Sequence, residues 1–190
     1  AHAPLHRYLC EEAGGELSAF PGVFSSERLD AGSRLLLEQF ERLEPVERMI
    51  DLACGNGVLG LVACRRELAQ SVTFADESAL ALASTRHNAV ALLPGSVGSF
   101  DFLHGDGLSG YRGPPVSLIL CNPPFHHEAS VEESAGRHLL MQCKRHLRPG
   151  GQLCVVANRH LRYRPLLARQ FERVEKLAEN RKFIVWRCLK

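Results

Sequence analysis

From residue 46 onward, short apolar runs alternate with amphipathic segments, and this alternation restricts the possible folds more than any other feature of the chain. Five runs are expected to be buried strands, because each is short, apolar and bounded by polar or turn-forming residues. They are residues 48–52, 71–75, 99–103, 116–121 and 152–157. The helices expected between and after them are residues 57–67, 78–92, 132–146 and 162–171. This alternation predicts a doubly wound α/β fold.

The carboxy-terminal part of the chain predicts two further strands, at residues 173–177 and 182–189. A short polar turn joins them, and a tight turn permits an antiparallel hairpin but not a parallel crossover. We therefore expect a mostly parallel seven-stranded sheet with an antiparallel last strand. Residues 1–45 precede the pattern and are expected to form a linker, with a loop at 21–25 and a lead-in helix at 30–43.

A glycine-rich turn, Asp51-Leu52-Ala53-Cys54-Gly55-Asn56-Gly57, joins the first predicted strand to the first predicted helix. Gly55 and Gly57 allow a close backbone approach, and the helix N-terminus offers free N–H groups to a carboxylate or phosphate. The spacing departs from the dinucleotide-binding fingerprint, because Ala53 occupies the first glycine position. Alanine is expected to be tolerated there if its φ angle is negative.

Two acidic residues follow the next predicted strands. Asp76 ends the second strand, where a carboxylate can accept hydrogen bonds from both hydroxyls of a ribose. Asp106 follows the third strand and is placed to reach an adenine amine, with an ordinary turn aspartate as the alternative. Because open α/β sheets bind ligands at the carboxyl ends of their strands, these residues predict a nucleoside-binding site.

The tetrapeptide Asn122-Pro123-Pro124-Phe125 follows the fourth predicted strand at the same edge of the sheet. Two consecutive prolines stiffen this loop. It offers an amide oxygen, a backbone carbonyl and an aromatic face, which together suit an exocyclic amine on a planar ring. With the glycine-rich turn upstream, the motif predicts an enzyme that methylates such an amine.

Charge is divided unevenly along the chain. Residues 1–133 hold 9 Lys+Arg and 18 Asp+Glu, whereas residues 134–190 hold 14 Lys+Arg and 3 Asp+Glu. This asymmetry favours a basic face that meets a polyanion, with a solvated helix surface as the alternative. The fifth strand is followed by Arg159, His160 and Arg162, which are candidates for phosphate or base contacts. A solvated surface is the alternative for these residues as well.

Cysteine content and hydropathy indicate the compartment. The seven cysteines are odd in number and lack C-x-x-C spacing, which favours reduced thiols in a cytoplasmic protein over a disulfide framework or a metal site. No apolar stretch approaches the roughly 20 residues that a membrane span requires. The start of the chain lacks the apolar segment of a signal peptide.

Three stretches, residues 24–33, 51–57 and 122–126, resemble S-adenosylmethionine-dependent class I methyltransferases, which have a Rossmann-like fold. The resemblance is closest to the bacterial ribosomal RNA guanine-N2 methyltransferases. Residues 156–161 and 180–183 look like the member that acts on large-subunit 23S rRNA, while the small-subunit 16S member shares the first three stretches. The resemblance implies that residues 46–190 form the catalytic domain, and that an amino-terminal methyltransferase-like domain of the same protein is missing here.

The resemblance also implies roles for individual residues. The cofactor S-adenosylmethionine would contact Asp51, Ala53, Gly55, Gly57, Asp76, Asp106 and Asn122. Asn122 and the Pro123 carbonyl would accept hydrogen bonds from the guanine N2 amine, and Phe125 would stack on the base. Substrate contacts would come from Pro124, His126, Arg159, His160 and Arg162. The product would be S-adenosylhomocysteine, and no metal is expected because methyl transfer needs none.

Other functions fit parts of the same pattern. Asn-Pro-Pro loops also serve enzymes that methylate adenine N6 in nucleic acid or a glutamine amide in protein. A non-enzymatic alternative is a degenerate RNA-binding domain, against which the intact Asp51, Asp76 and Asn122 argue. The leading hypothesis remains a methyltransferase for guanine N2 in 23S rRNA, with the 16S rRNA enzyme as its nearest alternative.

Overall fold

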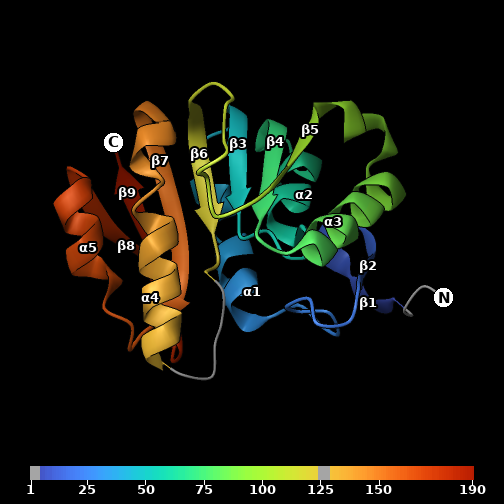
Figure 1. Ribbon diagram of the computed structural model, residues 1–190, viewed down its shortest axis with the longest axis horizontal. Helices are drawn as coiled ribbons and strands as arrows, with labels where there is room; N and C mark the ends of the chain where they lie inside the picture. The colour runs from blue at the N-terminus through green and yellow to red at the C-terminus, as the bar shows by residue number, and fades with distance from the viewer. Residues whose placement is uncertain (1–4, 124–128) are drawn as a thin grey trace.

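The computed structural model describes residues 5–123 and 129–190, with side chains in the second range from residue 133. Within these residues, seven strands form one sheet in the order β5-β4-β3-β6-β7-β9-β8 (Figure 1). The strands are β3 (Val46–Leu52), β4 (Ala69–Asp76), β5 (Phe100–His104), β6 (Val116–Cys121), β7 (Leu147–Asn158), β8 (Arg173–Glu179) and β9 (Phe183–Leu189). The helices are α1 (Ala31–Leu37), α2 (Val58–Arg65), α3 (Ala79–Leu92), α4 (Ala129–Leu140) and α5 (Tyr163–Gln170).

The sheet has the predicted topology. β3, β4, β5, β6 and β7 pair in parallel, and β9 runs antiparallel to both of its neighbours, β7 and β8. The expectation of a mostly parallel seven-stranded sheet with an antiparallel last strand is therefore confirmed. The chain order changes direction between β3 and β6, which is where a doubly wound sheet opens a crevice for a ligand.

Apolar side chains alternate between the two faces of the sheet and form two large cores. On one face, Met49, Leu118 and Leu120 pack with residues of α1, α2 and α3. On the other face, Ile50 and Ile119 pack with residues of α4 and α5. This burial on both faces explains why the central strands read as continuous apolar runs. Among the described residues, no helix is long and apolar enough to cross a membrane.

The strand register aligns the carboxyl ends of the central strands. Leu52 of β3 pairs with Ala75 of β4 and with Cys121 of β6. Consequently Ala53, Asp76 and Asn122, which directly follow Leu52, Ala75 and Cys121 in the sequence, lie at the same edge of the sheet. Parallel pairing thus brings the three sequence motifs together.

Residues 1–45 contain structure that the sequence analysis did not predict. An antiparallel hairpin, β1 (His6–Cys10) and β2 (Gly15–Ala19), packs on α3. Asn88 of α3 fixes β2, because its side chain accepts a hydrogen bond from the N–H of Ser18 and donates one to the carbonyl of Ser18, both of 2.8 Å. The lead-in helix is also shorter than predicted: α1 ends at Leu37, and a 3₁₀ turn covers Phe40–Arg42.

The fourth helix and the fifth strand of the sheet also differ from the prediction. The expected helix at 132–146 is observed as α4 over 129–140 followed by a 3₁₀ turn at Lys144–His146. The Pro149-Gly150-Gly151 cluster, which follows the predicted helix, lies inside β7. Gly150 has a φ of 82°, and the β6–β7 register shifts between Val116 and Leu118, so the cluster forms an irregularity within the strand.

Candidate functional site

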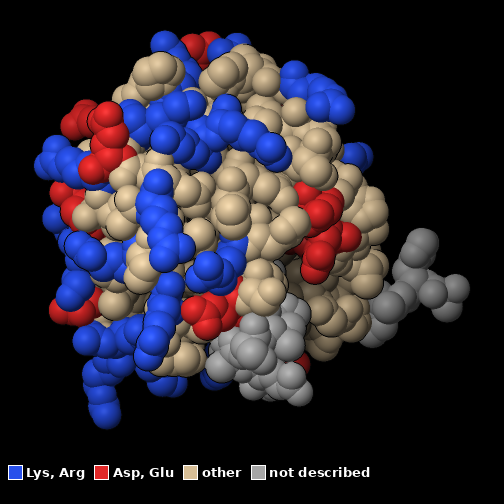
Figure 2. Space-filling view, turned by 60° about the vertical axis from the view of Figure 1, so that its left-hand side comes forward, with Lys and Arg blue, Asp and Glu red and all other residues tan. Residues whose placement is uncertain are grey.

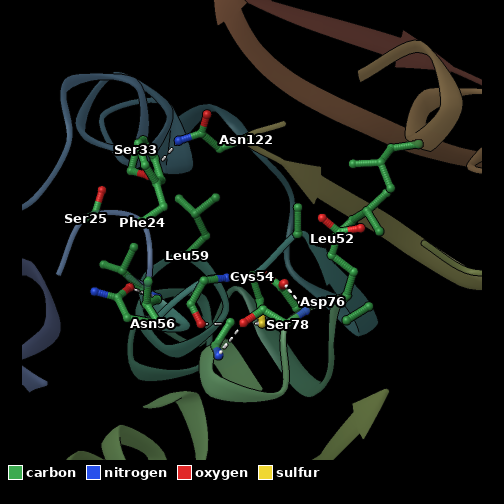
Figure 3. Close-up of a pocket in the computed structure, with 18 of the residues that line it drawn as sticks. Phe24, Ser25, Ser33, Leu52, Cys54, Asn56, Leu59, Asp76, Ser78 and Asn122 are labelled. Atoms are coloured by element: carbon green, nitrogen blue, oxygen red, sulfur yellow. Dashed lines mark hydrogen bonds between the residues drawn. The ribbon is translucent and has the colours of Figure 1, made fainter. Parts of the chain in front are cut away.

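A pocket of about 240 Å³ lies at the carboxyl edge of the sheet (Figure 3). Its walls come from the β3–α2 turn, the end of β4, the loop after β5, the loop before α1, and α4. The sequence-predicted residues that line it are Ala53, Gly55, Asp76, Asp106 and Asn122. Parts of the chain that are far apart in sequence therefore contribute to one site.

The β3–α2 turn owes its shape to three left-handed residues. Ala53, Gly55 and Gly57 have φ angles of 58°, 58° and 86°. A side chain at Gly57 would place its Cβ 2.6 Å from Cγ2 of Thr85, so glycine is required there by space as well as by conformation. The condition of a negative φ, under which alanine was expected to be tolerated at residue 53, is not met, because this alanine adopts a conformation that favours glycine.

Asp76 joins the glycine-rich turn to the end of β4. Its Oδ2 accepts a hydrogen bond of 2.9 Å from the N–H of Gly55, and its Oδ1 accepts one of 2.9 Å from the N–H of Ser78. The opposite side of the turn is held by Thr85, whose hydroxyl donates to the carbonyl of Gly55 at 2.9 Å. A carboxylate oxygen accepts more than one hydrogen bond, so Asp76 can brace this turn and still receive a ligand hydroxyl.

Asp51 and Gly57 are not among the residues that line the pocket. The Asp51 side chain is 1% exposed, and its Oδ2 accepts a hydrogen bond of 2.9 Å from the N–H of Gly60 in α2. Its Oδ1 has no hydrogen-bond partner among the described residues. Burial raises the pKa of the Asp51 carboxyl to about 8, although the Gly60 hydrogen bond opposes this rise. A buried carboxyl oxygen without a hydrogen-bond partner among the described residues therefore lies beneath the turn.

Asp106 contacts a residue that the sequence analysis missed. Nε2 of His138, in α4, lies 2.8 and 2.9 Å from the two carboxylate oxygens of Asp106. Both side chains are more than half exposed, and both residues line the pocket. This contact ties the loop after β5 to α4. No motif in the sequence marks His138, because its role depends on how α4 packs.

The side-chain amide of Asn122 is held by two residues from the region before the sheet. Its Nδ2 donates to Oδ2 of Asp30 at 2.9 Å and to Oγ of Ser33 at 3.0 Å. Figure 3 shows the nitrogen of Asn122 turned toward Ser33. Asp30 also caps α1, because its Oδ2 accepts a hydrogen bond of 2.9 Å from the N–H of Ser33. Asp30 and Ser33 belong to the stretch 24–33 but were assigned no role from the sequence.

A second pocket, of about 190 Å³, lies on the other side of Asn122. It shares Phe24, Asp30 and Asn122 with the first pocket, and it also includes Pro123 and Phe183. The other residues in its walls are Val156, Ala157, Asn158, Leu161 and Tyr163. Asn122 thus stands in the wall common to the pocket that contains Asp76 and Asp106 and to a second, largely apolar pocket.

The remaining predicted site residues lie elsewhere. Arg159, His160 and Arg162 are exposed after β7 and line neither pocket. Arg159 donates from Nη1 to Glu179 and to the carbonyl of Asn180, both at 2.9 Å, so it holds the β8–β9 turn. Pro124, Phe125 and His126 lie outside the described residues.

Comparison with known proteins identifies the family. The family model described as "Methyltransferase small domain" matches residues 14–187 of the chain. This chain belongs to the methyltransferase small domain family. The match confirms the methyltransferase resemblance, and residues 14–187 include the stretches 24–33, 51–57 and 122–126 that carry it.

The relatives of this methyltransferase small domain include proteins named "Ribosomal RNA large subunit methyltransferase G". The one from Streptomyces avermitilis is 42% identical over 191 residues, which cover 97% of this chain and 49% of the relative. The one from Vibrio vulnificus (strain YJ016) is 35% identical over 190 residues, covering 99% of this chain and 50% of the relative. The chain therefore spans about half the length of these relatives.

A solved structure has the same fold over the whole methyltransferase small domain. It is a T. thermophilus 16S rRNA N2 G1207 methyltransferase in complex with AdoMet and guanosine. The TM-score is 0.81 at 25% identity, covering 100% of this chain and 51% of that one. Within the described part of the present chain, no cluster of three or more His, Cys, Asp or Glu residues could hold a metal ion. All seven cysteines are free thiols.

Proposed function

We propose that this protein transfers a methyl group from S-adenosylmethionine to the exocyclic N2 amine of a guanine in 23S ribosomal RNA. The observation that carries the proposal is the position of Asn122 between two pockets. One pocket has carboxylates suited to a nucleoside with hydroxyl and amino groups, and the other has the apolar walls that a planar base requires. The names of the relatives and the guanosine-bound structure support the same substrate class.

The larger pocket fits S-adenosylmethionine on the chemistry of its walls. Asp76 and Asp106 supply acceptors for the ribose hydroxyls and the adenine amine, and the turn at Ala53 and Gly55 lets backbone approach the ligand. Asp51 does not line the pocket, but the positively charged amino group at the methionine end of a bound cofactor would favour the ionised form of its buried carboxyl, whose Oδ1 has no partner among the described residues. When bound, the cofactor supplies an electrophilic methyl group on its sulfonium sulfur.

The protein's contribution to methyl transfer is orientation. Oδ1 of Asn122 and the backbone carbonyl of Pro123 would each accept a hydrogen bond from the guanine N2 amine, which directs its lone pair toward the cofactor side. These oxygens also stabilise the positive charge that develops on nitrogen during transfer. The amine then loses its proton to water. Phe125 would stack on the base, as the sequence resemblance implies.

The surface beside the smaller pocket suits a polyanion. Figure 2 shows Lys and Arg side chains gathered on the side of the molecule that carries α5 and β8. Exposed members of this basic surface are Arg159, Arg162, Arg164, Arg169, Arg173, Lys176, Arg181 and Lys182. Arg181 and Lys182 lie next to Phe183, which lines the smaller pocket. We propose that the basic surface contacts RNA phosphates while the guanine enters the smaller pocket.

Two further parts of the proposal concern the whole protein. Because the chain spans about half the length of its relatives, an amino-terminal methyltransferase-like half of the same protein is proposed to add RNA contacts.

The cellular compartment proposed for the protein is the cytoplasm. Its thiols are reduced and mostly buried, and its proposed substrate is ribosomal RNA.

A second candidate is the same reaction on small-subunit RNA, since the guanosine-bound structure is named a 16S rRNA enzyme. Incubation with labelled S-adenosylmethionine and separate 23S rRNA, 16S rRNA, DNA and protein pools discriminates these activities. Label in 23S rRNA supports the proposal, label in 16S rRNA supports the second candidate, and label in DNA or protein alone refutes both. Calorimetry with S-adenosylmethionine tests cofactor binding separately.

A further inference from the structure

Asp30 connects the loop before α1 to the residue that stands between the two pockets. Its carboxylate lies 2.9 Å from Nδ2 of Asn122, and both residues line both pockets. The second hydrogen of Nδ2 is directed at Ser33 Oγ, at 3.0 Å. The two donors of the Asn122 amide are therefore satisfied on the α1 side, and among the described residues no hydrogen bond is made to its acceptor oxygen.

The carboxylate of Asp30 can fix the orientation of the Asn122 side-chain amide. An ionised carboxylate only accepts hydrogen bonds, so it attracts the NH₂ group of Asn122 and repels its oxygen. Ser33 lacks this selectivity, because a hydroxyl can donate as well as accept. Rotation of the amide by half a turn would bring two acceptor oxygens together at Asp30. The carboxylate therefore selects one orientation.

Asp30 is itself fixed in place. Its Oδ1 accepts a hydrogen bond of 2.7 Å from the hydroxyl of Ser25, and its Oδ2 accepts one of 2.9 Å from the N–H of Ser33. Ser25 has a φ of 61°, a left-handed conformation that a serine rarely adopts without support from its surroundings. The hydrogen bond that the amide donates to this charged acceptor also polarises the amide, which strengthens its oxygen as an acceptor.

We propose that Asp30 is a positioning residue that turns the Asn122 amide oxygen toward the substrate and so makes the site selective for an N–H donor. This inference rests on the proposed function for its catalytic consequence, but the amide orientation is a property of the protein alone. A substrate atom that lacks hydrogens, such as a keto oxygen, would face the Asn122 oxygen and be rejected.

Asp30→Ser is the informative substitution. Serine caps helices about as well as aspartate, so α1 retains its N-cap while the carboxylate is removed. Glu27→Ser is the matched control, because Glu27 is an exposed acid in the same loop and has no hydrogen bond or ion pair with the described residues. Thermal unfolding of both variants verifies that they are folded.

The first readout is the side-chain NH₂ signal of Asn122 in nuclear magnetic resonance spectra, assigned by its loss in Asn122→Ala. Because both hydrogens are bonded in the wild-type protein, they should exchange slowly with solvent. Exchange is expected to accelerate at least about tenfold in Asp30→Ser and to stay unchanged in Glu27→Ser. Unchanged exchange in folded Asp30→Ser overturns the proposal, whatever activity the protein has.

The second readout is methyl transfer to guanine-containing RNA. Asp30→Ser is expected to lower kcat by about tenfold or more, with KM and S-adenosylmethionine affinity within about twofold of wild type. In an Asn122→Ala background the same substitution should cause no further loss, because Asp30 acts through Asn122. Equal losses in both backgrounds overturn the proposal. An inactive wild-type protein instead counts against the proposed function, and the NH₂ signal still decides the role of Asp30.

Discussion

The carboxylate of Asp76 accepts a hydrogen bond of 2.9 Å from the backbone N–H of Gly55, and this bond joins the end of β4 to the glycine-rich turn after β3. The two strands are neighbours in the sheet, with Leu52 paired to Ala75. A residue expected only to bind ribose therefore also maintains the shape of the adjoining wall of the pocket. Its two roles make Asp76 the most informative position for testing cofactor binding.

Asp76→Ala should weaken S-adenosylmethionine binding by about 1.5–3 kcal/mol, the range for a hydrogen bond to a charged group. Glu77→Ala is the matched control, because Glu77 is the neighbouring acid, lines the same pocket and makes no side-chain hydrogen bond to the turn among the described residues. We expect a smaller loss for the control in calorimetric titrations. Equal affinities of folded Asp76→Ala and wild type would remove Asp76 from the cofactor site.

Asn122→Ala should leave cofactor affinity nearly unchanged but reduce methyl transfer by roughly 10²-fold or more, because the lost oxygen stabilises charge only in the transition state. Binding is measured by calorimetry and transfer by incorporation of labelled methyl groups into RNA. Wild-type turnover by this variant would mean that the Asn-Pro-Pro-Phe loop has only a structural role.

Ala53→Gly should stabilise the protein. A left-handed conformation costs a non-glycine residue roughly 1–2 kcal/mol, and the greater freedom of glycine in the unfolded chain offsets about half of the gain. The net increase in the free energy of unfolding, measured with urea, should be about 0.5 kcal/mol. Ala63→Gly, inside α2, is the control and should destabilise by about 1 kcal/mol or more. A loss of stability in both variants would contradict the φ of 58° at Ala53.

The buried carboxyl of Asp51 predicts a pH dependence of the cofactor-free protein. Its pKa is raised to about 8, whereas an aspartate in the unfolded chain ionises near 3.9. Between these values the folded state holds a proton that the unfolded state has lost, so stability is retained at low pH and falls as pH rises. The slope attributable to Asp51 is at most about 1.4 kcal/mol per pH unit. Asp51→Asn lacks this titration.

The measurement is the difference in unfolding free energy between wild type and Asp51→Asn, determined from pH 5 to pH 8 in steps. All other titrating groups are common to both proteins, so their contributions cancel to first order. The wild type should lose stability relative to the variant as pH rises. A constant difference across this range would show that Asp51 is ionised in the folded protein.

RNA binding should depend on the basic surface. Replacing both Arg159 and Arg162 by Ala should flatten the log–log dependence of RNA affinity on salt by about one unit for each phosphate that the variant no longer neutralises. Arg86 and Arg112 form the control pair, because they are exposed and lie outside the basic surface. If log affinity falls with log salt concentration at the same slope for wild type and the Arg159/Arg162 variant, these two arginines do not neutralise RNA phosphates. Cofactor affinity should be the same in all three proteins.

Much of the fold followed from local pattern. Continuous apolar runs identified the central strands because both faces of β3, β6 and β7 are buried, and the polar turn after β8 identified the antiparallel hairpin. The meeting of Asp76 and Asn122 at one edge also followed, since parallel strands end together. These relationships depend on residues close in sequence or on the geometry common to parallel sheets.

Other features depend on tertiary contacts that no local pattern records. The β1–β2 hairpin is held through Asn88, 70 residues away from Ser18. His138 reaches Asp106 only because α4 packs across the loop after β5, and Asp30 reaches Asn122 across 92 residues of chain. The left-handed conformation of Ala53 is a local feature, but an alanine in the sequence does not indicate a positive φ. Sequence reasoning therefore located the pocket but missed the residues that brace it.

The central claim is that the protein methylates guanine N2 in 23S rRNA. The most direct measurement is mass spectrometry of nucleosides from 23S and 16S rRNA, each lacking the modification, after incubation with S-adenosylmethionine and the protein. The account predicts N2-methylguanosine in 23S rRNA with wild-type protein and almost none with Asn122→Ala. A methyl group on another atom, such as adenine N6, or equal yields from wild type and Asn122→Ala, would contradict it.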